Sequence, residues 1–173
     1  LALYEGRYAD VEKILRPAIA EDEKSGNVLG QSAKWVVLAE AYEAQDKTAG
    51  AAAAAGNALA RAKGQPIHVL AASVLIRAGQ ASDARATVAG FSQRLESQSR
   101  AYGKILEGRI AVKERRVADA VDAFTAAQKL ADLWMARFDL GVAYVEAEYF
   151  AERMQDELDR TPELDRKRRH DID

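Results

Sequence analysis

The feature that most constrains this chain is a pattern of large and small apolar residues that recurs along it. Trp35, Leu38, Ala39 and Tyr42 occupy positions i, i+3, i+4 and i+7, which lie on one stripe of an α-helix. A polar turn follows at residues 45–47, and an alanine-rich second helix comes after it. The same pattern of a helix, a turn and a second helix recurs around Gly108 and Ala111 with Ala120, Phe124 and Ala127, around Leu140, Gly141 and Tyr144 with Phe150, and more weakly around Ala71, Ala72 and Leu75 with Ala84 and Val88. The pattern predicts helical hairpins in series.

The spacing of these copies is nearly regular. Equivalent positions in the second helices are Val11, Ala51, Ala84, Ala120 and Arg153, separated by 40, 33, 36 and 33 residues. A period of about 20–50 residues is typical of arrays in which each unit packs on its neighbours. The longer separations predict loop insertions near residues 21–31 and 93–99.

This pattern resembles the tetratricopeptide repeat, W-x2-L-G-x2-Y followed by A-x3-F in a unit of about 34 residues. The resemblance covers most of the chain and implies an all-α, right-handed α-α superhelix of about five helix-turn-helix units. The expected units are residues 1–25, 32–63, 66–95, 100–131 and 133–160, in one solenoid domain over 1–173 that ends in a charged helix at 161–173. Ala55, Glu107 and Arg153 depart from the family pattern. Arg153 replaces the small residue of the last unit, so the fifth unit is expected to be a degenerate, capping repeat.

Three local signals refine this expectation. Residues 1–6 read as the end of a helix running into a turn, so we expect the chain to begin inside a longer protein. Pro17 falls inside a helix predicted over about residues 8–23, and we expect a bend there because proline lacks an amide donor. Thr161, Pro162 and Glu163 are typical of a helix start.

The composition argues against several classes of function. Lys and Arg number 25 against 27 Asp and Glu, so no basic excess favours nucleic acid. The run at 166–169 is basic but is diluted by neighbouring acids, which favours a solvated helix. The absence of cysteine and the presence of only two histidines, His68 and His170, disfavour a metal site or a thiol nucleophile. No acid–base pair or phosphate loop stands out, so we predict no enzyme activity and no cofactor.

No run of about 18 apolar residues is present, so the sequence predicts no membrane insertion within this segment. The compartment stays open. A cysteine-free chain suits the cytoplasm, which we slightly favour, and also the periplasm.

The resemblance implies that the first helix of each unit lines a concave face whose outward edge meets a ligand. That edge is expected to be an apolar channel with cations at its centre and acids, such as Glu43 and Glu146, at its ends. The predicted peptide-binding groove consists of Val69, Ile76, Arg77, Ile105, Arg109, Val112, Lys113, Phe138 and Val142. The alternative is that curvature buries many of these side chains.

Arg77, Arg109 and Lys113 could bind acidic side chains or a terminal carboxylate, because a guanidinium is a planar two-pronged donor. The alternative is solvated helix charges, and the groove lacks the asparagines with which some family members grip a peptide C-terminus. Trp134 and Met135 open the last unit, where packing between repeats is favoured over an adaptable binding surface.

These observations favour a non-catalytic scaffold that binds a protein or peptide, with acidic groups among its contacts, in the concave groove. Two alternatives stay open. The chain could be a regulatory or substrate-recruiting module of a larger enzyme, such as a bacterial kinase or glycosyltransferase, or it could associate with itself as a homo-oligomer.

Overall fold

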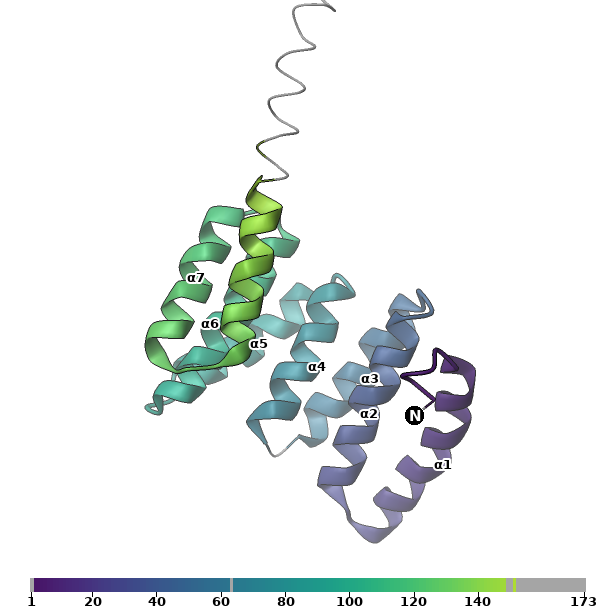
Figure 1. Cartoon of the computed structure of the whole chain (residues 1–173). Helices are drawn as coiled ribbons and strands as arrows, with labels where there is room; N and C mark the ends of the chain where they lie inside the picture. The colour runs from purple at the N-terminus through teal and green to yellow at the C-terminus, as the bar shows by residue number, and fades with distance from the viewer. Residues whose placement is uncertain (1, 63, 149–150, 152–173) are drawn as a thin grey trace, which may run out of the picture.

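The computed structural model describes residues 2–62, 64–148 and 151, and the regular elements within these ranges are all helices, with no strand. The prediction of an all-α fold is therefore confirmed. In chain order the helices are α1 (Tyr8–Ser25), α2 (Val28–Glu43), α3 (Thr48–Arg61), α4 (Gln65–Arg77), α5 (Ala81–Ser92), α6 (Ser97–Lys113), α7 (Val117–Leu130) and a last helix over residues 134–148 (Figure 1).

One turn geometry recurs five times along the described chain. A residue with positive φ occupies it each time: Gly6 (73°), Gly26 (71°), Asp46 (56°), Gly79 (81°) and Arg115 (60°). Its N–H donates to the carbonyl three residues earlier, and the following N–H donates to the carbonyl five residues earlier, which together satisfy the helix end. The next helix begins two residues later each time. The turns at Gly6, Asp46, Gly79 and Arg115, which precede α1, α3, α5 and α7, are 40, 33 and 36 residues apart, the same separations as the sequence repeats.

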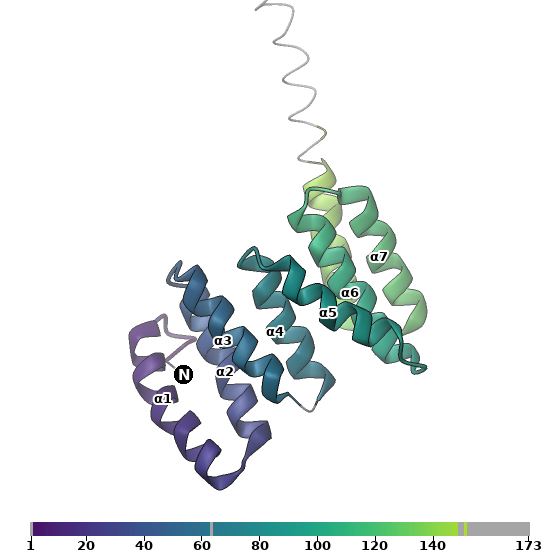
Figure 2. The ribbon, with the colours of Figure 1, turned by 180° about the vertical axis from the view of Figure 1, so that it is seen from behind.

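The helices pack in two layers. Each helix from α1 to α7 contacts its neighbours in the chain, and α4 additionally contacts both α2 and α6. The views from the two sides agree with this arrangement: α2 and α4 lie side by side in Figure 1, and α3 and α5 face the viewer in Figure 2. One layer therefore consists of α2, α4 and α6, and the other of α3, α5 and α7.

Small residues let the paired helices approach closely. Ala51, Ala55 and Ala58 of α3 are fully buried. A Cβ built on Gly50 would lie 3.2 Å from the ring of Tyr42. The alanine-rich helix α3 is thus a packed element: its alanines are buried, and the absence of a side chain at Gly50 admits the Tyr42 ring from α2.

Several boundaries differ from those predicted. α1 extends to Ser25 and α2 begins at Val28, so the loop insertion predicted at 21–31 is wrong, because the extra residues lengthen these two helices. The connection predicted near 93–99 is present but shorter: it covers residues 93–96, and α6 begins at Ser97. α1 is continuous from Tyr8 through Pro17 to Ser25, so the proline does not end the helix.

Two predictions concern residues that the structure does not cover. The second helix of the fifth unit and the charged helix at 161–173 lie outside the described residues.

Candidate functional site

A hollow lies between α4, α6 and the helix over residues 134–148. It has a volume of about 470 Å3, and one α7 residue, Phe124, also lines it. We call it the apolar groove. It is lined by Ser73, Ile76 and Arg77 of α4, by Arg109, Val112 and Lys113 of α6, by Phe124, and by Trp134, Phe138, Asp139 and Val142.

Most of the predicted groove residues come together here, although they lie far apart in the sequence. Ile76, Arg77, Arg109, Val112, Lys113, Phe138 and Val142 all line the apolar groove. The placement of Val69 and Ile105 in the groove is wrong: neither lines it, and both are core residues, 1% and 0% exposed. Each lies four residues, about one helical turn, before the first groove residue of its helix, Ser73 in α4 and Arg109 in α6.

Arg109 lies at the back of the groove and ties three helices together. Its Nε donates to Asp139 Oδ2 at 2.7 Å, and one Nη donates to Ser73 Oγ on α4. The side chains of Arg109 and Asp139 are 23% and 13% exposed. Sequence reasoning expected Arg109 to be available to a ligand anion, but its described contacts hold the 134–148 helix against α6 and α4.

The other two cations lie closer to solvent. Arg77 donates to both carboxylate oxygens of Glu43, at 2.5 and 2.7 Å, and this bonding raises the pKa of Arg77. Lys113 Nζ donates to the carbonyl of Arg77 at 2.9 Å and has no carboxylate partner among the described residues. The rim at Lys113 is therefore the part of the groove that can accept a carboxylate from a ligand.

An aromatic wall completes the groove. The rings of Trp134 and Phe138 are 6.5 Å apart in an edge-to-face arrangement, and their side chains are 71% and 64% exposed. Met135 packs partly buried against the core, as expected, but Trp134 does not. Sequence reasoning missed Trp134, Phe124 and Asp139 as groove residues. The i, i+4 spacing of Trp134 and Phe138 was the available signal for the wall.

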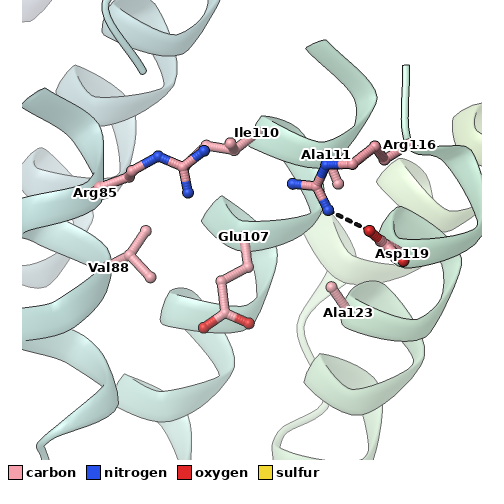
Figure 3. A pocket seen from close by; sticks show the side chains of 8 residues that line it. All are labelled: Arg85, Val88, Glu107, Ile110, Ala111, Arg116, Asp119 and Ala123. Atoms are coloured by element: carbon pink, nitrogen blue, oxygen red, sulfur yellow. Dashed lines mark hydrogen bonds and ion pairs between the residues drawn. The ribbon is translucent and has the colours of Figure 1, made fainter. Parts of the chain in front are cut away.

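Two further hollows are less suited to a ligand. The one between α5, α6 and α7 has a volume of about 230 Å3, with Arg85 and Arg116 on opposite sides (Figure 3). These cations already pair with Glu114 and Asp119, so their charge is satisfied. The hollow beside α3, α4 and α5 is lined by His68, whose Nδ1 bonds to the carbonyl of Gly64 at 2.9 Å.

The described residues contain neither a group of metal ligands nor a helix that could span a membrane. In residues 2–62, 64–148 and 151, no three His, Cys, Asp or Glu side chains are grouped so that they could hold a metal ion. Within the same ranges, every helix is too short or too polar to cross a membrane. The groove's chemistry is thus apolar contact with a cationic rim.

Glu40 carries an effect of pH on stability. Burial raises the pKa of its carboxyl above the ordinary value of 4.5, Arg77 opposes this shift, and Glu43 adds to it. A raised carboxyl pKa favours the fold below about pH 4.5, and this contribution is lost as the pH rises through the folded-state pKa. We therefore expect Glu40→Gln to have a higher free energy of unfolding than the wild type at about pH 7 but not at about pH 4.

Urea titrations of both proteins at the two pH values measure this difference. A difference that is the same at both pH values would contradict the assignment to Glu40.

In comparisons with known proteins, no family model, no curated protein and no solved structure matches the chain.

Proposed function

We propose that this chain is a non-catalytic binding module whose apolar groove takes a short segment of a partner protein. The segment carries bulky apolar side chains for the groove and a carboxylate for its rim. The observation that carries the proposal is the exposed wall of Trp134 and Phe138 beside the cationic rim at Lys113.

The exposed apolar surface supports this. Water contact with apolar surface costs about 25 cal/mol per Å2. A ligand that covers Trp134, Phe138 and Val142 is therefore stabilised in the groove by the burial of their exposed surface. A hollow of about 470 Å3 lies within the range of ordinary binding pockets. The groove is large enough for a few side chains and too small for a folded domain to enter.

The architecture supports the same function. We propose that the repeated hairpins form a right-handed superhelix of the tetratricopeptide kind, in which α2, α4 and α6 line the concave face. The equivalent turns before α1, α3, α5 and α7 support this proposal. Because Arg109 fixes the 134–148 helix against α4 and α6, the groove is formed before a ligand arrives and loses little entropy on binding.

Selection from a random peptide library displayed on phage, with the wild-type chain as bait, tests the proposal. We expect the enriched peptides to combine bulky apolar residues with Asp or Glu. Val142→Asp is expected to raise their Kd at least about tenfold, since a carboxylate would face the apolar side chains of the ligand. Lys113→Glu is expected to weaken the acidic peptides but not their Asn or Gln counterparts.

Leu95→Asp is the matched control. Leu95 is 95% exposed in the connection before α6 and is absent from the groove, so the same apolar-to-acid change there should leave the Kd unchanged. Fluorescence anisotropy of labelled peptides gives each Kd. Enriched peptides that bind Val142→Asp as tightly as the wild type would contradict the proposal.

A further inference from the structure

The helix over residues 134–148 is apolar on two opposite faces. Its inner face packs Ala136 and Ala143, both fully buried, against the core, and in Figure 1 it runs along α6 and α7. Its outer face is exposed. Among the described residues, five of the ten large apolar side chains that are exposed lie on this one helix: Trp134, Phe138, Val142, Tyr144 and Val145. A helix that is apolar on both sides is typical of one packed between two partners.

The outer face follows the spacing of a helix–helix seam. Trp134, Phe138, Gly141, Val145 and Glu148 are all exposed and are separated by four, three, four and three residues. This alternation keeps one stripe of a helix in contact with a second helix along its length. The occupant of this face is therefore a helix that runs beside it.

The face is complementary to itself in antiparallel orientation. Gly141 lies at its centre, and a Cβ built there meets nothing within 4 Å, so a second helix can approach closely. Arg137 is exposed towards one end and Glu148 at the other, so an antiparallel pair places each arginine near the glutamate of the other copy. Arg137 pairs with Asp132 in the single chain, and since both are exposed, this bond exchanges at little cost.

We infer that two copies of this chain pair through their 134–148 helices, antiparallel about a two-fold axis at Gly141. This inference goes beyond the proposed groove, because Gly141, Val145 and Glu148 do not line the groove. Trp134 and Phe138 belong to both surfaces, so pairing and ligand binding are linked. The contact is one helix about 22 Å long, which suits a micromolar rather than an obligate dimer.

Sedimentation equilibrium of the full chain from about 1 μM to about 500 μM tests the pairing. We expect reversible dimerisation and an increase of the dimer Kd of at least about tenfold in Val145→Asp. Leu95→Asp is the matched control and should dimerise like the wild type. A wild-type monomer at every concentration, or an unchanged Kd in Val145→Asp, would overturn the inference.

A charge exchange tests the antiparallel orientation. Arg137→Glu and Glu148→Arg alone are each expected to raise the dimer Kd about threefold. The double variant restores the pair between copies, so its Kd should return to within about twofold of the wild type. A double variant as weak as the sum of its parts would overturn the antiparallel arrangement.

Cross-linking gives a second, independent reading. The chain has no cysteine, so Gly141→Cys introduces a single thiol at the centre of the seam. Under mild oxidation we expect rapid formation of a disulfide-linked dimer, since the two copies of this position face each other. Leu95→Cys should cross-link much more slowly, and equal rates would count against the seam.

Peptide binding by Val145→Asp separates this inference from the proposed function. The variant is expected to lose pairing but to bind the selected peptides, because the Val142 and Lys113 contacts stay intact.

Discussion

Gly108→Val is expected to lower the free energy of unfolding by about 3 kcal/mol, within the upper range for overpacking of a tight core. A Cβ built at Gly108 would lie 2.4 Å from one ring carbon of Phe124 and 2.7 Å from two others. Phe124 is only 1% exposed, so its ring cannot move into solvent. The branched side chain therefore forces α6 and α7 apart at Gly108 and Phe124. Urea unfolding followed by far-ultraviolet circular dichroism measures the loss.

Gly56→Ala is the control for helix propensity. Gly56 is exposed in α3, and a Cβ built there meets nothing within 4 Å. Replacing a mid-helix glycine with alanine at such a site stabilises by up to about 1 kcal/mol. Gly108→Ala has the same propensity gain, so a net loss there isolates the clash with Phe124. If Gly108→Ala were as stabilising as Gly56→Ala, the close contact would be contradicted.

A second-site change tests the contact itself. Phe124→Leu removes ring atoms next to Gly108, so it is expected to destabilise the wild type more than it destabilises Gly108→Ala. Residues in contact show coupling of about 0.5–3 kcal/mol in such a cycle. Additive effects of the two substitutions would show that the ring and the glycine do not meet.

The helical order could be predicted because its signals are local. The turns at Gly6, Asp46, Gly79 and Arg115 have the spacing of the sequence repeats, since large and small residues fix which faces pack within each hairpin. Helix ends were less predictable. Within residues 21–31 the chain turns only at Gly26 and Asn27, and the helices on both sides continue up to that turn.

The groove was only partly predictable because burial depends on how successive hairpins tilt. Ile105 and Val112 lie on the same predicted edge of α6, seven residues apart, yet Ile105 is in the core and Val112 lines the groove. Polar partners were missed for a different reason. Arg109 pairs with residues 30 and 36 positions away, and Arg77 with one 34 positions away, so the partners lie about one repeat apart. Comparing each arginine with the acids about one repeat before and after it would have found Glu43 and Asp139.

The second large effect is expected at Arg109. Arg109→Met removes the charge that Asp139 and Ser73 contact, and it leaves the Asp139 carboxylate, 13% exposed, without its cation. Breaking a buried pair costs about 3–5 kcal/mol, and because Arg109 keeps 23% exposure we expect about 2 kcal/mol. The loss should be concentrated in the 134–148 helix, so its amides are expected to exchange with deuterium faster while those of α2 and α3 stay protected.

Two variants separate this anchor from a general effect of removing charge. Arg85→Met breaks the pair with Glu114, whose side chains are 55% and 34% exposed, and should change stability by less than about 0.5 kcal/mol. Asp139→Asn in the Arg109→Met background removes the orphaned charge and is expected to recover about half of the loss. If Arg109→Met cost no more than Arg85→Met, or if exchange in the 134–148 helix were unchanged, the groove wall would not depend on this contact. If the double variant recovers stability and its 134–148 helix again exchanges slowly, the loss in Arg109→Met came from the unpaired Asp139 carboxylate. The groove wall then depends on Asp139 having a charged partner.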